Sequence, residues 1–202
     1  MKPWDGKIAY LLVRPLRDTR VHPNHLTTLG LALGLTAAGL LASGHRGAMN
    51  WGAALFVVSA IVDHADGELA RLAGKTSPFG HTYDRAADLV VKLALFAGMG
   101  MGVRSRFGTL GLLMGLAAGA ALVAIFLMRS EIARRHGTEA LALPAGGGFE
   151  LEDILYVVAP VTWLGLLAPF VAAASIGAPL FALWIARGLR TPMIAAKTVS
   201  PE

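Results

Sequence analysis

The sequence contains no cysteine and little charge. Without cysteine, the chain can form neither a disulfide nor a thiolate metal site. Only 15% of its 202 residues are charged, whereas 55% are hydrophobic. Soluble domains rarely have this balance, and long apolar runs are typical of membrane spans. Charge and proline interrupt residues 1–20, so we expect no cleavable signal there.

The apolar runs predict six membrane spans in a single domain over residues 1–202. Before them, residues 1–20 mix apolar and basic side chains, and we expect an amphipathic helix on the membrane surface, broken at Pro15. The predicted fold is therefore an all-α integral membrane protein, with a six-helix bundle over residues 25–190 and a cytoplasmic tail over 191–202. The expected spans lie near residues 25–43, 51–70, 83–103, 108–128, 152–173 and 177–190.

The distribution of Lys and Arg predicts the orientation. If the N-terminus is cytoplasmic, fourteen Lys and Arg residues lie inside, and only Arg46, Arg104 and Arg106 lie outside. We expect a multi-pass protein of the bacterial inner membrane with both termini in the cytoplasm. The net charge of +5 then faces anionic headgroups, and no nucleic acid partner is expected.

Four aspartates stand at the ends of two neighbouring apolar segments. Asp63 and Asp66 are three residues apart, and Asp84 and Asp88 are four apart, so each pair shares one face of a helix. The orientation places all four at the cytoplasmic ends of spans two and three. Solvated helix ends would explain one such residue. Four like charges, however, require a cation, and their oxygens suit Mg²⁺ or Mn²⁺.

Glycines recur at the spacing of packed membrane helices. This spacing lets two backbones approach closely, either inside one chain or between two copies. Internal packing is the more common use. We nevertheless expect a homodimer, with the ridges on spans three and four as its interface. The glycines are Gly30 and Gly34, Gly98 and Gly102, and Gly111, Gly115 and Gly119.

The aspartates belong to a longer pattern that resembles the signature of the CDP-alcohol phosphotransferases. The opening of the first span, "HPNHLTTLG", is similar to the Pro-Asn-x2-Thr seen in many members. The resemblance also covers the hydrophobic architecture of nearly the whole chain. It implies transfer of a substituted phosphoryl group from a CDP-linked donor to an alcohol, with release of CMP. The pattern is Asp63-x2-Asp66-Gly67-x2-Ala70-Arg71-x8-Gly80-x3-Asp84-x3-Asp88.

The resemblance also implies a role for each matching residue. Two divalent ions, Mg²⁺ or Mn²⁺, would be held by Asp63, Asp66, Asp84 and Asp88, and Asp88 would also be the general base. Lys92 either neutralises Asp88 or meets the acceptor, and basic residues near the ends of spans four and six are further acceptor candidates. The donor pocket would be formed by Asn24, Thr27, Asp63, Asp66, Gly67, Ala70, Arg71, Gly80 and Asp84, and the acceptor site by Lys92, Arg129, Arg187 and Arg190.

Three functions remain open. The first is phospholipid synthesis, with CDP-diacylglycerol as the donor and a small polar alcohol as the acceptor. The second uses a soluble CDP-polyol donor and an inositol-phosphate-type acceptor, since "GFELED" at residues 148–153 is similar to such members. The third is a divalent-cation transporter. Transporter sites usually lie near the bilayer midplane, however, whereas these aspartates lie at the cytoplasmic edge.

The charge distribution leads to a prediction about topology. A single cysteine placed at residue 46 should react with a membrane-impermeant maleimide added outside intact cells, because Arg46 lies on the side with few basic residues. A cysteine at residue 75 serves as the control and should react only after the membrane is permeabilised. Labelling of residue 46 from the cytoplasm alone would contradict the topology.

Overall fold

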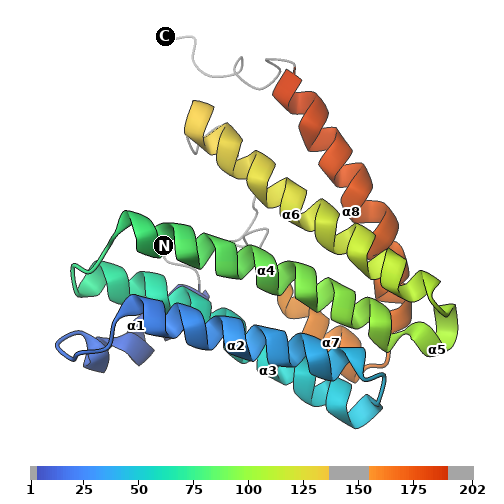
Figure 1. Cartoon of the computed structure of the whole chain (residues 1–202), viewed down its shortest axis with the longest axis horizontal. Helices are drawn as coiled ribbons and strands as arrows, with labels where there is room; N and C mark the ends of the chain where they lie inside the picture. The colour runs from blue at the N-terminus through green and yellow to red at the C-terminus, as the bar shows by residue number, and fades with distance from the viewer. Residues whose placement is uncertain (1–3, 137–154, 191–202) are drawn as a thin grey trace, which may run out of the picture.

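The structure, a computed structural model, describes residues 4–136 and 155–190. These residues form helices and turns and contain no β-strand, which confirms the predicted all-helical class. Figure 1 shows α2, α3 and α4 running side by side, with α6 and α8 extending away from them. The elements are α1 (Trp4–Val13), η1 (Arg14–Leu16), α2 (Pro23–Ala42), α3 (Arg46–Leu72), α4 (Pro78–Gly102), α5 (Arg104–Phe107), α6 (Leu110–His136), α7 (Val158–Trp163) and α8 (Leu167–Arg190).

Four of the helices are long and apolar enough to cross a membrane: α2, α3, α6 and α8. Helix α4 has 25 residues, which is also long enough, but Arg85, Asp88 and Lys92 lie within its apolar stretch. Helix α4 is therefore long enough to cross a membrane, but charged residues interrupt its apolar stretch, and it is one of the two helices that carry the aspartates. The prediction of six spans remains a prediction.

The predicted boundary between the last two spans is wrong. Helix α8 continues from Leu167 to Arg190 and contains Pro179, whereas we expected a break at residues 174–176. The chain turns earlier, at Gly165, which has a φ of 74° that glycine adopts without strain. Membrane helices tolerate internal glycine and proline, so Gly177 and Pro179 do not end this one. The start of the predicted fifth span and "GFELED" lie outside the described residues.

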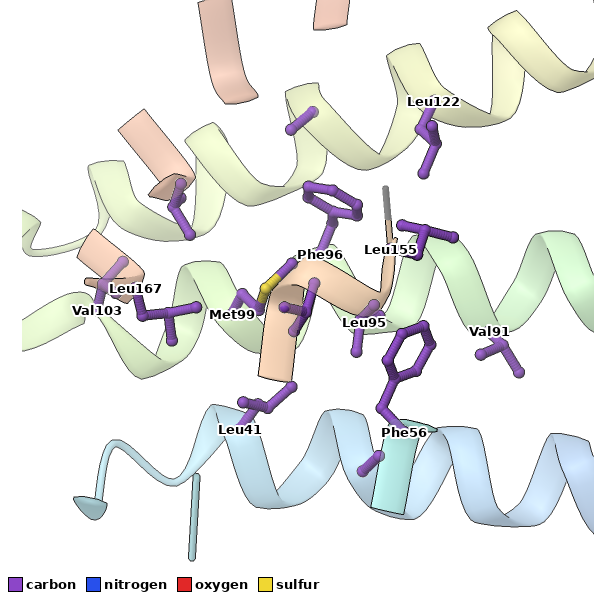
Figure 2. Close-up of a cluster of buried hydrophobic side chains, with 14 residues drawn as sticks. Leu41, Phe56, Val91, Leu95, Phe96, Met99, Val103, Leu122, Leu155 and Leu167 are labelled. Carbon is purple, nitrogen blue, oxygen red and sulfur yellow. The ribbon is translucent and has the colours of Figure 1, made fainter. Parts of the chain in front are cut away.

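Helix α2 is the centre of the packing. It lies against both α3 and α4, while α3 and α4 make few contacts with each other. Helix α4 then packs on α6, and α6 on α8. Figure 2 shows the cluster of buried side chains along α4, where Leu95 and Met99 lie near Leu41 of α2 and Phe56 of α3. Helices α3 and α4 both pack on α2 but make few contacts with each other. Space therefore remains between them near the loop that joins the end of α3 to the start of α4, which we call the loop side.

The glycine ridges are filled by helices of the same chain. A Cβ atom at Gly98 or Gly102 of α4 would collide with the backbone carbonyls of Ala38 and Leu41 in α2. On the opposite side of α4, Gly100 lies against Gly111 and Gly115 of α6. The prediction that these ridges form a dimer interface is therefore wrong, because spacing shows that a partner helix approaches but not which helix it is.

The N-terminal helix is anchored to α3 by a small apolar cluster. Ala9 and Val13 are buried against Ala65 and Leu69, whereas Leu11 and Leu12 of α1 are exposed. The helix ends at Val13, and a 3-10 turn containing Pro15 follows, so the predicted break is confirmed. The location of α1 on a membrane surface remains a prediction.

The close approach of α4 and α6 leads to a stability prediction. Gly115→Ala should lower the free energy of unfolding by about 1–3 kcal/mol, because the new methyl group meets the Phe96 carbonyl and the Gly100 backbone. Gly39→Ala is the matched control, since nothing lies within 4 Å of a Cβ at that position. Thermal unfolding in detergent measures both variants. Equal unfolding temperatures would show that the α4–α6 contact is looser than described.

Candidate active site

Three aspartates from two helices form a compact group of oxygen atoms. Asp63 and Asp66 lie on α3, Asp84 lies on α4, and one carboxylate oxygen from each lies within 4.8 Å of the others. The start of helix α4 determines where Asp84 lies relative to the two aspartates of α3. Pro78 occupies its first turn, and the Ser77 hydroxyl accepts the Gly80 N–H at 3.0 Å. The predicted meeting of the two pairs is thus confirmed for three residues.

Helix α2 fixes one of these carboxylates. The Thr27 hydroxyl donates a hydrogen bond to Asp66 Oδ2, and both residues are only 3% exposed. The first turn of α2 is held by two imidazoles. His22 Nδ1 accepts the Asn24 N–H at 3.3 Å, and His25 Nδ1 accepts the His22 N–H at 3.2 Å. The N-terminal end of α2 therefore forms one wall of the site, and through Thr27 it orients the Asp66 carboxylate.

The fourth aspartate, Asp88, lines the same cavity as Asp63 and is bonded to a lysine. Its Oδ1 accepts a hydrogen bond from Lys92 Nζ one turn further along α4. The Lys92 ammonium also lies 4.3 Å from the centre of the Phe126 ring of α6. The structure therefore brings together three of the four predicted metal ligands and gives Asp88 a different partner.

A loop-side cavity opens where α3 ends and α4 begins. It has an empty volume of about 580 Å³. Eight of the nine residues expected to bind the donor line it, and Asp63 is the exception. Arg71 is held there by Glu68 Oε1 at 3.0 Å, and its side chain is 65% exposed. The lining residues are Pro23, Asn24, Thr27, Asp66, Gly67, Ala70, Arg71, Lys75, Thr76, Ser77, Gly80, His81 and Asp84.

An inner cavity lies between α3 and α4, one to two helical turns further from the loop that joins them. Its empty volume is about 540 Å³, and its polar lining includes Asp63, Asp88 and Lys92. Leu155 and Tyr156, which precede α7, form part of the wall. Asp66 and Asp84 line the loop-side cavity, and Asp63 and Asp88 line the inner one. The carboxylates thus stand between two compartments.

Two site residues escaped the sequence analysis. His64 lines the inner cavity, and its Nδ1 donates to the Ala60 carbonyl at 2.9 Å. The cavity is wide enough to border adjacent positions of α3. Lys75 lines the loop-side cavity and donates to the carbonyls of Thr19 and Val21 at 3.0 Å. The sequence signal that could have identified Lys75 is its position inside the aspartate pattern, between Arg71 and Gly80.

Of the predicted acceptor residues, only Lys92 lines one of the two cavities described above. Arg129 and Arg187 line neither of these cavities, and Lys92 is bonded to Asp88. Arg190 is the last residue of α8, and its side chain lies outside the described part. Near the end of α6, Glu131 instead pairs with Arg134 and Arg135. Basic residues at helix ends are also typical membrane anchors, which is why sequence alone did not separate the two roles.

The donor set fits a hard divalent cation. Asp63, Asp66 and Asp84 offer only oxygen ligands at mutual distances that a single ion or a close pair of ions can bridge. Without a cation these like charges would repel one another at low dielectric. The nearby cation, Lys92, is bonded to Asp88 rather than to these three residues.

A group of three partly buried carboxylates with a cavity on each side could hold a divalent cation next to bound ligands. Residues 20–187 match the CDP-alcohol phosphatidyltransferase family, and the chain belongs to that family.

Comparison with known proteins agrees with this assignment. Over 118 residues the chain is 36% identical to a "Bifunctional IPC transferase and DIPP synthase" of Rubrobacter xylanophilus, a match that covers 58% of this chain and 26% of that protein. The fold resembles Mycobacterium tuberculosis phosphatidylinositol phosphate synthase (PgsA1) with CDP-DAG bound, at a TM-score of 0.63 and 22% identity, over 96% of this chain and 100% of that one. The same enzyme in complex with manganese and citrate has a TM-score of 0.59 and 22% identity, over 98% and 94% of the two chains.

The Thr27–Asp66 hydrogen bond predicts a change in metal affinity. Thr27→Val removes this bond but keeps the side-chain volume, and it should weaken Mn²⁺ binding by roughly 10–100-fold, as for other groups that orient a ligand. Thr28→Val is the control, because Thr28 contacts the Tyr83 hydroxyl at 2.9 Å instead. Isothermal titration of the purified protein with Mn²⁺ measures both. Equal affinities would contradict the role of Asp66 as a ligand.

Proposed function

We propose that this protein transfers a substituted phosphoryl group from a CDP-linked donor to the hydroxyl of a small polar alcohol and releases CMP. The observation that carries the proposal is the position of the aspartates between two cavities. One cavity is lined by nearly all of the residues that resemble the family's donor pocket. The other contains Asp88, a carboxylate without a place in the group of three.

Asp63, Asp66 and Asp84 would hold Mg²⁺ or Mn²⁺, with Asp88 next to them, and the family resemblance favours two ions. When bound, such ions offset the negative charge that develops on phosphate oxygens during transfer. The carboxylates contribute by remaining in place. Asp66 is fixed by Thr27, so little reorganisation is needed when a donor enters.

The loop-side cavity would take the CDP half of the donor. Arg71 supplies a fixed positive charge with a planar fork of N–H groups, which suits phosphate oxygens. Gly80 lets the side chains of Ser77 and Asn24 approach the first turn of α4, since a Cβ there would lie 3.0 Å from Ser77 Oγ and 3.2 Å from Asn24 Oδ1. The same glycine keeps its N–H bonded to Ser77, so the helix end remains rigid.

The inner cavity would take the acceptor hydroxyl. In the transfer, the hydroxyl oxygen forms a bond to the phosphorus while the bond from that phosphorus to the CMP oxygen breaks. The hydroxyl proton passes to Asp88, the carboxylate of this cavity outside the group of three. CMP then leaves as a phosphate monoester through the loop-side cavity.

For the donor we propose CDP-diacylglycerol, and hence a role in phospholipid synthesis. The presence of four helices long and apolar enough to cross a membrane supports a lipid substrate. A soluble CDP-polyol donor with an inositol-phosphate-type acceptor is the second candidate. The 36% identity to the Rubrobacter protein favours it. A cation transporter would not need the loop-side cavity and its donor-type lining, so we do not favour that function.

The same proposal locates the enzyme in the membrane. We propose that α3 ends and α4 begins at the cytoplasmic face of a bacterial inner membrane, which places both cavities in reach of soluble nucleotides. The distribution of basic residues supports this orientation. A homodimer remains part of the proposal, through a surface other than the glycine ridges.

The division of labour between the aspartates predicts two different defects. Asp88→Asn should lower CMP release by about 100-fold or more through loss of the base, while donor affinity stays near that of the wild type. Asp66→Asn should weaken donor binding and turnover together, because it removes a ligand. Radiolabelled CMP release and donor binding, each with Mn²⁺ and after exhaustive chelation, measure this. Full turnover without a divalent ion, or equal loss of donor binding in both variants, would contradict the scheme.

A further inference from the structure

The Lys75 side chain joins the loop between α3 and α4 to the segment that leads into α2. Its Nζ donates to the Thr19 carbonyl and to the Val21 carbonyl, each at 3.0 Å, across 56 and 54 positions of the sequence. Residues 17–22 form neither helix nor strand, so their carbonyls need donors from elsewhere. A hydrogen bond from a charged donor is stronger than one between neutral groups, so this connection is a firm one.

The backbone of Lys75 is placed by the end of α3. Gly74 has a φ of 63°, which glycine adopts without strain. The Lys75 N–H then turns back to the Ala70 carbonyl at 3.0 Å, the longer of the two bonds of a Schellman motif at a helix C-terminus. The main chain of Lys75 is therefore bonded to α3, while its side chain is bonded to the segment before α2.

Apolar contacts hold the same segment from another direction. Leu16 and Val21 are partly buried against the small cluster that α1 and α3 form. Leu72 and Ala73, at the end of α3, pack on the same cluster. These contacts fix side chains, whereas the two carbonyls are fixed by Lys75. The segment before α2 is thus fastened to the end of α3 by both kinds of interaction.

This connection lies at the rim of the loop-side cavity, which Lys75 itself lines. One wall of the cavity is the start of α2, with Asn24 and Thr27, and another is the α3–α4 loop, with Thr76 and Ser77. The loop residues lie outside the helices, so helix packing does not fix them directly. The two bonds of Lys75 cross from the loop to the segment before α2 and therefore join these two walls.

We propose that Lys75 is a positioning residue for the CDP-linked donor, because it holds the start of α2 at a fixed distance from the α3–α4 loop. A pocket that is ordered before binding loses less binding free energy to the ordering of its walls. Lys75 therefore acts on donor affinity and not on the transfer step, which takes place at the aspartates. The inference rests on the proposed function, since it assumes that the CDP half of the donor enters this cavity.

Lys75→Met is the main test, with CMP and Mn²⁺ as the binding probe. The Kd for CMP and the donor KM should both rise by roughly tenfold, while kcat stays within about twofold of the wild type. Lys75→Arg should restore most of the affinity, because a guanidinium can donate to two carbonyls at once. Trypsin should also cleave after the exposed Arg20 faster in Lys75→Met, because the segment is released.

A crosslink separates the connection from the charge of Lys75. The chain has no cysteine, so Thr19→Cys combined with Lys75→Cys introduces two thiols that a short, reducible bis-thiol reagent can join. The crosslinked protein should bind CMP within about threefold of the wild type, and reduction of the link should weaken binding by roughly tenfold. Arg17→Met is the matched control, because it removes one exposed positive charge from the same segment. It should leave the Kd for CMP, kcat and the rate of cleavage after Arg20 unchanged.

Three results would overturn the proposal. The first is an unchanged Kd for CMP in Lys75→Met, and the second is a fall in kcat at unchanged donor KM. The third is a crosslinked protein that binds CMP as weakly as the reduced one, since Lys75 would then act through its charge. If Lys75→Met does not fold, the crosslinked protein before and after reduction decides the same question. A wild type that binds no CMP in the presence of Mn²⁺ would instead refute the proposed function.

Discussion

The whole site depends on one electrostatic constraint: acidic groups gathered between apolar helices are stable only when a cation or a hydrogen-bond donor faces them. Each of the structural features around the aspartates answers that constraint. Thr27 donates to Asp66, Lys92 donates to Asp88, and one oxygen each from Asp63, Asp66 and Asp84 lies within 4.8 Å of the others. A hard divalent ion would neutralise these three carboxylates, and a phosphoryl-transfer reaction requires the same kind of ion.

Close helix packing makes the two cavities possible. Glycines let α4 approach α2 on one side and α6 on the other. These two helices fix α4 along its length, although it makes few contacts with α3. The gap between the loop-side halves of α3 and α4 then remains open, and α2 forms its floor with Asn24 and Thr27. A chain whose glycines were replaced by larger residues would move α4 outward and separate Asp84 from Asp63. The packing and the chemistry are therefore consequences of the same spacing of small residues.

Much of this was predictable from the sequence, for identifiable reasons. Helical periodicity placed each pair of aspartates on one face, and the short loop ending in Ser77 and Pro78 placed the pairs opposite each other. The glycine ridges were recognised, but which helix fills them depends on the three-dimensional path of the chain. The break expected at residues 174–176 failed because proline and glycine inside a membrane helix are tolerated. The contact of Lys92 with the Phe126 ring joins residues that are remote in sequence, so no local pattern predicted it.

Anomalous diffraction from crystals grown with Mn²⁺ and a non-hydrolysable CDP-linked donor tests the central claim most directly. The account predicts a manganese peak, single or double, bounded by Asp63, Asp66 and Asp84, with the cytidine in the loop-side cavity near Arg71 and the reacting phosphate toward Asp88. Manganese bound elsewhere, or a donor seated away from the gap between α3 and α4, would contradict it.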